Sequence, residues 1–246
     1  MSDRPTSRGS CSKKLRRTLA TLISFYLVSG LINLRTSPAK WRGLAGDRRS
    51  FFEREPLEVG QSLIGMELGS DLSEGRCGGL IVETEVYVGP EDRASHSWNA
   101  RRTARTEVMF GPRGYSYVFQ IYGMHYCFNI VVGAGRVPAA VLIRALRPTF
   151  GLEIMAKNRG LSSVPANLRQ LTSGPGRLAQ ALGIDRQANG LDLCQAPLWV
   201  RRSPVGRRLA AVHGIRAGAR INIDYAGDWA RRNWRFTLSE DRFVSV

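Results

Sequence analysis

Residues 80–88 constrain the fold more than any other part of this chain, because their side chains alternate with a period of two. Aliphatic residues and a threonine fall on one side of this segment, and Glu83, Glu85 and Tyr87 fall on the other. The pattern predicts a β-strand with one face packed on a core. The opposite face aligns two carboxylates with a phenol, which is unusual in a protein that is otherwise strongly basic.

The charge of the chain indicates a polyanionic partner or a basic tail. Its 246 residues carry a formal net charge of +16, and residues 1–50 alone hold 11 Lys/Arg against 2 Asp/Glu. The rest of the chain stays basic, and almost all of its cations are arginines, which hold phosphate through two donors at once. An arginine bias of the whole proteome would explain this equally well.

The cysteines and histidines do not form a metal-site pattern. Four cysteines lie far apart without a C-x-x-C pair, and there are three histidines. We therefore expect no metal, no cofactor and no disulfide framework, and a reducing cytoplasmic setting, associated with the nucleoid if the source is bacterial.

Residues 1–50 differ from the rest of the chain. A basic polar segment precedes an apolar stretch at residues 19–32, which is shorter than the roughly 20 residues of a membrane span. We expect a basic, disordered or weakly helical extension rather than a convincing targeting or transmembrane segment. A signal peptide or membrane-surface anchor is the alternative interpretation.

Residues 51–246 are expected to form one α+β domain with a curved, mainly antiparallel sheet, flanking helices and a protruding aromatic hairpin. The patterns predict helical segments at 57–62, 151–158 and 175–183, with Ser173 as a plausible cap. Predicted strands are 63–68, 78–88, 141–145, 191–201, 221–224 and 234–238. Residues 90–107 are expected to be a loop.

Residues 114–126 are dense in aromatic side chains and predict the hairpin. Tyr115, Tyr117 and Phe119 share one strand face, and a core ladder is the favoured interpretation for the two tyrosines. Tyr122 precedes Gly123, which suggests a turn that presents the ring. On a basic protein, such a ring is suited to insertion between stacked bases.

The basic loop and a helix start predict contacts to phosphate. Arg101, Arg102 and Arg105 lie close together in residues 90–107, and Ser173 and Arg177 flank a predicted helix start. Helix N-termini bind anions through free N–H groups, although an ordinary capped helix explains the second motif as well.

A strand glutamate beside aromatic and arginine side chains suits a general base that activates water. A single glutamate is usually only solvated, but the second carboxylate on the same face and the nearby His96 favour a catalytic role.

Several separate motifs together resemble the monofunctional, metal-free 3-methyladenine (alkyladenine) DNA glycosylases. The matching segments are residues 82–92, 122–124, 142–145, 171–175 and 225–230, in the family's order. The resemblance covers roughly residues 55–246 and leaves residues 1–50 uncovered.

The resemblance implies a role for each matching residue. Glu85 corresponds to the general base, Arg144 to a residue that positions the water or the backbone near the base, and Glu83 is left as a supporting group. The implied base pocket consists of Tyr87, His96, Phe119 and Asn129, with Phe119 where some relatives have tyrosine. Tyr122, with Met124 beside it, corresponds to the side chain inserted into DNA. Arg101, Thr103 and Arg105 correspond to backbone contacts, and the role of His125 stays open.

The activity implied is hydrolysis of the N-glycosidic bond of an alkylated purine in duplex DNA after base flipping. We expect the enzyme to be a monomer that needs no protein partner and does not bind a membrane. Within residues 51–246 the one lysine is Lys157, so no amine lies near the motifs to form a Schiff base, and the enzyme is expected to leave an abasic site. Two alternatives are a non-catalytic protein that binds damaged or bent DNA, and a membrane-associated basic protein.

Overall fold

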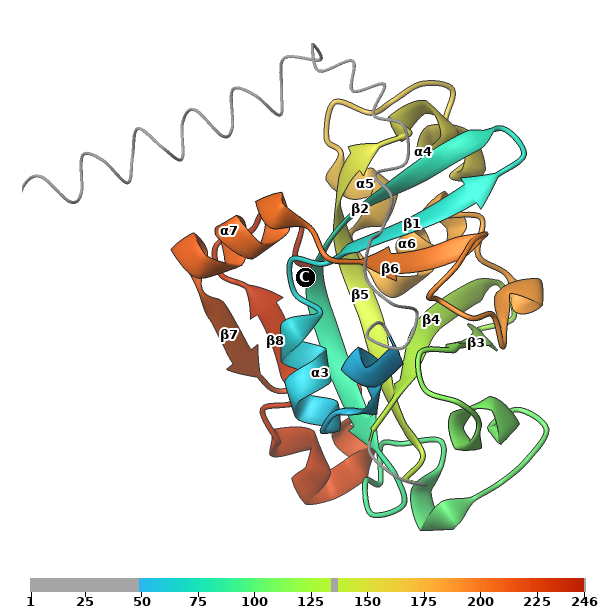
Figure 1. Cartoon of the computed structure of the whole chain (residues 1–246), viewed down its shortest axis with the longest axis vertical. Helices are drawn as coiled ribbons and strands as arrows, with labels where there is room; N and C mark the ends of the chain where they lie inside the picture. Colours follow the sequence, from blue (N-terminus) through green and yellow to red (C-terminus); the bar gives the residue numbers. More distant parts are fainter. Residues whose placement is uncertain (1–48, 134–136, 246) are drawn as a thin grey trace, which may run out of the picture. The chain divides into compact units, whose positions relative to one another are not determined.

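The computed structural model describes residues 49–133 and 137–245 of the chain (Figure 1). The apolar stretch at 19–32 and nearly all of the predicted extension lie outside these residues. Within them, no helix is long and apolar enough to cross a membrane.

The core of the fold is an antiparallel sheet of eight strands, with helices around it, and this confirms the predicted α+β class (Figure 1). The strand order is β3-β4-β5-β2-β1-β6, and β8 pairs with β2 on the same edge as β1, beyond the residues that β1 occupies, and carries β7 at its outer edge. The strands are β1 Glu67–Leu72, β2 Gly75–Val88, β3 Ser116–Ile121, β4 His125–Val132, β5 Ala139–Phe150, β6 Leu198–Arg201, β7 Ile215–Gly218 and β8 Arg235–Leu238.

Strand β2 is the centre of the sheet and is longer than predicted. It pairs with β5 along almost its whole length, while its other edge pairs first with β1 and then, at Glu83–Glu85, with β8. Residues 77–86 are all buried, on both faces of the strand. One face of β2 therefore packs on the apolar core, and the opposite face, with the glutamates, lies in a second, polar interior and is not exposed to solvent.

Helix α3, Pro56–Ser62, covers the apolar face of β2. The hydroxyl of Thr84 donates to the carbonyl of Gly60 at 2.9 Å, and a Cβ atom at Gly60 would collide with the side chain of Val86. The close approach of α3 therefore requires glycine at this position. It leaves the face with Glu83, Glu85 and Tyr87 for the site on the other side of the sheet.

The remaining helices are α4 Leu152–Asn158, α5 Arg169–Thr172, α6 Pro175–Ala181 and α7 Pro204–His213. Helices α4 and α6 confirm the predicted helical segments. Helix α6 joins the sheet through the thiol of Cys77, which lies 3.8 Å from the carbonyl of Ala181. Helix α5 does so through Thr172, whose hydroxyl donates to the carbonyl of Leu146 at 2.8 Å.

Several predicted elements are wrong in extent or in type. The first strand begins at Glu67 and not at residue 63, because buried Leu63 and Ile64 pack in the turn after α3. Of residues 191–201 only Leu198–Arg201 form a strand, and residues 221–224 are a bend that leads into the 3-10 segment Asp224–Arg231. Helix α7 and strand β7 were not predicted.

Candidate active site

The polar interior beside β2 is organised by a β-bulge at Arg144. Glu83 is paired with Ala145 and Thr84 with Ile143, so Arg144 has no partner residue across the two strands. A bulge redirects a side chain, and here the guanidinium of Arg144 reaches both glutamates. Its Nε donates to Glu83 at 2.9 Å and its Nη1 to Glu85 at 3.2 Å.

Glu85 is completely buried and is held by three donors. Its Oε1 accepts the backbone N–H of Ile221 at 2.7 Å, and its Oε2 accepts the Tyr87 hydroxyl at 2.8 Å as well as Arg144. Burial alone would lower the pKa of Arg144, but the two carboxylates outweigh burial and raise that pKa. Arg144 therefore keeps its charge, and its hydrogen bonds fix the orientation of both carboxylates.

Glu83 has a different set of partners, which suits a supporting group. Its Oε1 accepts Nε of Arg144 and, at 2.7 Å, Nε of Arg235, and its Oε2 accepts the N–H of Ser245 at 2.6 Å. All of these contacts tie β2 to β5, β8 and the end of the described chain. Glu83 thereby anchors the arginine that contacts Glu85.

Tyr87 is fixed from behind by a buried ion pair. The guanidinium of Arg220 lies 4.7 Å from the centroid of the Tyr87 ring and makes two hydrogen bonds, of 2.6 and 2.9 Å, to Asp92. Burial, followed by the charge and the hydrogen bond of Glu85, raises the pKa of Tyr87 well above its usual value. The phenol consequently stays protonated and donates to Glu85.

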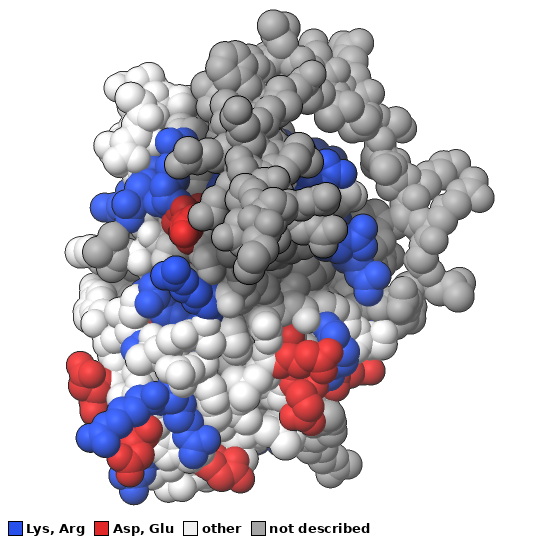
Figure 2. All heavy atoms as spheres, turned by 90° about the vertical axis from the view of Figure 1, so that its left-hand side faces the viewer, with Lys and Arg blue, Asp and Glu red and all other residues white. Residues whose placement is uncertain are grey.

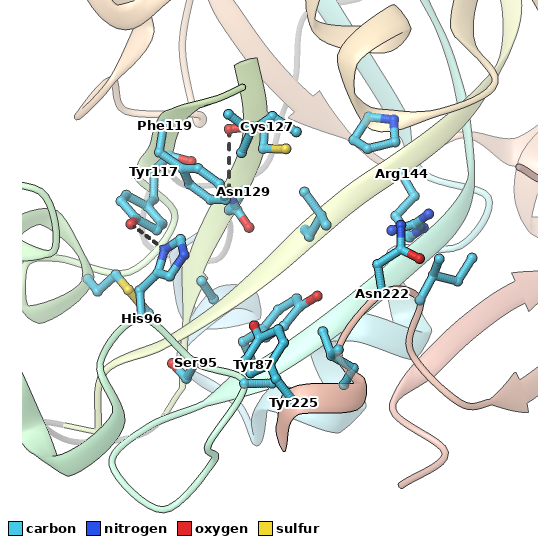
Figure 3. Close-up of a pocket in the computed structure, with 18 of the residues that line it drawn as sticks. Tyr87, Ser95, His96, Tyr117, Phe119, Cys127, Asn129, Arg144, Asn222 and Tyr225 are labelled. Carbon is cyan, nitrogen blue, oxygen red and sulfur yellow. Dashed lines mark hydrogen bonds between the residues drawn. The ribbon is translucent and has the colours of Figure 1, made fainter. Parts of the chain in front are cut away.

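A pocket of about 350 Å³ opens next to this cluster (Figure 3). Tyr87 and Arg144 line one side, and the rings of His96, Tyr117 and Phe119 line the other. The His96 and Phe119 centroids lie 4.6 Å apart with their planes at 72°, and Nδ1 of His96 is 2.9 Å from the Tyr117 hydroxyl. The volume is within the range of small-molecule sites, and the facing rings suit a flat aromatic ligand.

His96 is neutral at physiological pH. Burial, reinforced by the charges of Arg105 and Arg101, lowers its pKa from 6.5 to about 4. A neutral imidazole offers one donor and one acceptor, and no net charge, to a bound ring.

Asn129 and Cys127 form the floor of the pocket on strand β4. Asn129 is buried, and its amide nitrogen donates to the carbonyls of Tyr117 at 3.0 Å and Cys127 at 3.4 Å. The carboxamide is thereby held in place from within the hairpin. Burial raises the pKa of the Cys127 thiol to about 11, which keeps it protonated.

The hairpin tip carries the two exposed side chains predicted to enter DNA. Tyr122 is 84% exposed and Met124 70% exposed, and the Tyr122 ring also borders the pocket. Tyr122 and Gly123 both have positive φ, 52° and 70°, and Met124 N–H donates to the carbonyl of Ile121. A bulky residue is rarely found in this conformation, so the strain indicates a functional reason for the ring.

The predicted backbone contacts divide into two groups. Arg101, Thr103 and Arg105 are exposed on the loop that follows His96, as a contact to phosphate requires, and Arg177 is exposed on α6. Ser173 is different: it is buried, and its hydroxyl donates to the carbonyl of Phe243 at 2.8 Å. The prediction that Ser173 caps α6 is wrong, because Gly174 occupies the cap position and no side chain bonds the first turn.

The positive charge also extends over the side of α7 and β7. On the part of this face that Figure 2 shows uncovered, blue basic side chains are interspersed with red acidic ones. This face therefore carries charges of both signs. What sets the basic loop at residues 101–105 apart from it is its position beside the pocket and not its charge alone.

Sequence reasoning assigned no site role to the segment that closes the site from the other end of the chain, although residues 225–230 are among the segments that resemble the family. Ile221 supplies the backbone donor to Glu85, Arg220 supports Tyr87, and Asn222 and Tyr225 line the pocket. Asn222 has a φ of 58°, a conformation that asparagine tolerates well. In the strand predicted at residues 221–224, Asn222 between two isoleucines was the one local sign of a turn.

The described residues contain no group of three or more His, Cys, Asp or Glu side chains that could hold a metal ion. The groups at and beside the pocket that can carry chemistry are the buried carboxylates, the arginine and the rings. Stacking walls of this size accept a nucleobase, and a fixed carboxylate beside them suits hydrolysis. The fold and pocket define an enzyme that acts on a base held outside its stack.

Comparison with known proteins identifies the family. Residues 50–242 match the model of the methylpurine-DNA glycosylase family. A protein of Bacillus cereus (strain G9842) named "Putative 3-methyladenine DNA glycosylase" is 43% identical over 198 residues, which is 80% of this chain and 97% of that protein. Proteins of the same name from Bacillus mycoides (43%) and Bacillus anthracis (strain A0248; 42%) match over the same shares of both chains.

The chain belongs to the methylpurine-DNA glycosylase family. It is a DNA glycosylase, a hydrolase of DNA repair, and the alternative of a non-catalytic DNA-binding protein is not supported.

Proposed function

We propose that this enzyme hydrolyses the N-glycosidic bond of alkylated purines, such as 3-methyladenine, in duplex DNA and leaves an abasic site. The observation that carries the proposal is the Glu85–Arg144–Tyr87 cluster beside a base-sized aromatic pocket. The names of the relatives, which refer to 3-methyladenine, support the same substrate class.

Glu85 is the proposed general base. A carboxylate has about four lone-pair sites, and the three donors on Glu85 leave one of them for a water molecule. Glu85 takes a proton from this water, the water oxygen bonds to C1′ of the sugar, and the electrons of the glycosidic bond leave with the base. The carboxylate also offsets the positive charge that develops on the sugar.

The pocket rings are proposed to hold the flipped base. Tyr87 faces His96 and Phe119 across the cavity, and Asn129 lies at its floor. A 3- or 7-alkylated purine is cationic, so it stacks favourably on electron-rich rings and departs without needing an acid. Phe119 lacks a hydroxyl and is therefore proposed to contribute stacking alone.

Tyr122 is proposed to fill the gap that the flipped nucleotide leaves, with Met124 beside it. Both side chains are exposed at the hairpin tip, and Tyr122 also lines the pocket. Flipping costs a few kcal/mol, and stacking of an inserted ring on neighbouring bases offsets part of this cost. The residues proposed to contact the DNA backbone are Arg101, Thr103, Arg105, Ser173 and Arg177. All are exposed except Ser173, whose buried hydroxyl already donates to the carbonyl of Phe243.

The test is base release from duplex oligonucleotides that each carry one lesion: 3-methyladenine, 7-methylguanine, hypoxanthine or ethenoadenine. Glu85→Gln should abolish release, by roughly 10²–10⁴-fold, and leave duplex binding intact. Glu153→Gln, an exposed carboxylate on α4, is the control. Unchanged release by Glu85→Gln would show that Glu85 is not the base, and no release of any lesion by the native enzyme would refute the substrate class.

Monofunctional action is tested by borohydride trapping. The one lysine among the described residues, Lys157, is exposed on α4 and pairs with Glu74 at 2.6 Å, away from the pocket. Since none of the described residues places an amine at the pocket, we expect no Schiff base with the sugar, and borohydride should trap no covalent DNA adduct. A trapped adduct would contradict hydrolysis by water.

The catalytic domain is proposed to be residues 51–246, with residues 1–50 as a dispensable extension, and the enzyme to act as a monomer. The family match begins at residue 50. Arg49 donates to Asp192 at 2.6 Å, so a truncation should remove residues 1–48 and keep this ion pair. Full base release by the truncated protein, eluting as a monomer, is the expected result.

A further inference from the structure

The opening of the base pocket is marked by those lining side chains that are also exposed. Most of the described residues that line the pocket are buried or half-buried, and three are exposed: Tyr122, Asn222 and Tyr225. A side chain that lines a cavity and also faces solvent lies at its opening. Tyr122 belongs to the hairpin tip, and the other two belong to residues 222–225, which we call the second rim. The opening is therefore bordered by two segments that are distant in the sequence.

Tyr225 is unusually exposed for an aromatic side chain. The three most exposed large hydrophobic side chains of the described residues are Tyr122 at 84%, Tyr225 at 74% and Met124 at 70%. The next, Val212 on α7, is 54% exposed. Single exposed apolar residues are normal on a protein surface, but here the three highest exposures gather at the hairpin tip and the pocket opening. Such a concentration indicates a surface that a ligand covers.

The backbone that carries Tyr225 is held firmly, so the exposure of its ring does not come from a loose loop. The next residue, Ala226, is completely buried and packs with Ile223, and its N–H donates to the carbonyl of Ile223 at 2.9 Å. The N–H of Ile221 donates to Glu85 at 2.7 Å. Tyr225 therefore presents its ring from a fixed segment that also orients the proposed general base.

The part of a nucleotide that meets the second rim follows from the shape of the site. A nucleotide enters this pocket base first, because the interior offers stacking rings and because its phosphates stay joined to the duplex. Figure 3 shows Tyr225 on the side of the pocket where Tyr87 lies, opposite the rings of Tyr117 and Phe119. The sugar and the phosphates of a flipped nucleotide therefore remain at the opening, next to Tyr225.

We propose that Tyr225 is a substrate-binding residue, which packs its ring on the deoxyribose of the flipped nucleotide and donates its hydroxyl to an adjoining phosphate. A phenol suits both contacts, because its ring is apolar like the sugar carbons and its hydroxyl is a donor for a phosphate oxygen. The inference rests on the proposed function and adds a contact for the sugar to those proposed for the base and for the gap in the stack.

The charges of the second rim indicate a contact to one nucleotide and not to the duplex at large. None of residues 222–225 is basic, and Asp224 is exposed next to Tyr225. Non-specific attraction to DNA comes from lysine and arginine side chains, so this rim should contribute little to it. The contact of Tyr225 therefore depends on a nucleotide that has left its stack.

The experiment measures the affinity of the full-length protein for two duplexes that differ at one position. One has a normal nucleotide there, and the other has tetrahydrofuran, an abasic analogue that keeps the sugar ring and the phosphates and has no glycosidic bond to hydrolyse. Tyr225→Phe should bind the tetrahydrofuran duplex about tenfold more weakly than the native protein, which is the effect of one hydrogen bond to a charged acceptor, and Tyr225→Ala should lose more. Both variants should bind the undamaged duplex as the native protein does.

Val212→Ala is the matched control, because it removes an exposed apolar side chain that does not line the pocket. It should bind both duplexes with native affinity. The loss in Tyr225→Ala should be the same at low and at high salt, since a neutral side chain releases no counterions. Urea denaturation should show native stability for Tyr225→Ala, because the ring is exposed, so that the loss of binding is not a loss of folding.

The proposal is overturned if Tyr225→Ala binds the tetrahydrofuran duplex like the native protein, or if it loses the same factor on both duplexes, as an ordinary duplex contact would. Native affinity of Tyr225→Phe would overturn the hydrogen bond to phosphate. If the native enzyme releases none of the tested lesions, the proposed function fails, while the binding comparison still decides whether Tyr225 holds a flipped sugar. A native protein that does not prefer the tetrahydrofuran duplex to the undamaged one would overturn the inference about Tyr225 itself.

Discussion

The Tyr87 hydroxyl donates a hydrogen bond of 2.8 Å to Oε2 of Glu85, two residues earlier on the same strand. The two side chains meet because residues i and i+2 of a strand share a face. The contact couples the pocket wall to the proposed base, since a ring that moves to accommodate a purine also moves the donor that orients the carboxylate.

Tyr87→Phe separates the two functions of this residue. The variant keeps the stacking ring and loses the hydroxyl, so we expect roughly a tenfold fall in the single-turnover rate with little change in duplex affinity. Tyr87→Ala should lose both the rate and the binding of the flipped base. Rapid-quench kinetics and anisotropy measure the two quantities, and equal losses of affinity in both variants would contradict this division.

The buried ion pair behind Tyr87 should be important for stability. Asp92 and Arg220 are both inaccessible, with the closest approach 2.6 Å. Asp92→Asn leaves the guanidinium charge buried without its counterion, so we expect a loss of about 3–5 kcal/mol in the free energy of unfolding.

Urea denaturation measures this loss, and the exposed pair between Asp228 and Arg231, 3.8 Å apart, supplies the control. Asp228→Asn should change the free energy of unfolding by less than about 0.5 kcal/mol, because solvent screens exposed pairs. Equal effects of the two substitutions would show that burial of the Asp92 pair is not what matters.

The hairpin tip should show a conflict between stability and function. Tyr122, with a φ of 52°, and Gly123 are the two central residues of the turn from Ile121 to Met124, and Asn-Gly is among the most favourable sequences for a turn with two positive φ values. Tyr122→Asn should therefore raise the free energy of unfolding by about 1 kcal/mol, because asparagine tolerates this conformation, and should reduce base release.

Met124→Ala is the control for this prediction, since Met124 is also exposed at the tip and has no positive φ. It should bring no gain in stability. A Tyr122→Asn variant that is both more stable and fully active would contradict the prediction that the strained tyrosine is needed for base release.

Sequence reasoning predicted those parts of the site that depend on local pattern. The two-residue period placed Glu83, Glu85 and Tyr87 together, and a tyrosine before a glycine indicated the exposed turn. The family motifs brought in His96, Phe119, Asn129 and Arg144 at one pocket, where the structure places them all.

The parts that could not be predicted depend on contacts between distant residues. The backbone donor to Glu85 comes from Ile221, 136 residues later, and Arg220 reaches Asp92 across 128 residues. Periodicity carries no information about such pairs, and the isoleucines around Asn222 mimic a strand. The burial of Ser173 is likewise set by Phe243, which its local sequence does not reveal.

His96 should make the fold sensitive to mild acid. Its folded-state pKa is lowered to about 4 by burial and by the charges of Arg105 and Arg101, against 6.5 in a free chain. Between these two values the unfolded chain binds a proton that the folded protein does not, so stability is complete above about pH 6.5 and falls as the pH drops toward 4. The loss is on the order of 3 kcal/mol at most. Urea denaturation at pH 7 and pH 4.5 should show this loss of stability in the native protein and no such loss in His96→Gln. The control is His213→Gln, at an exposed histidine on α7, which should lose as much stability as the native protein. The same pH dependence in all three proteins would mean that other groups cause it.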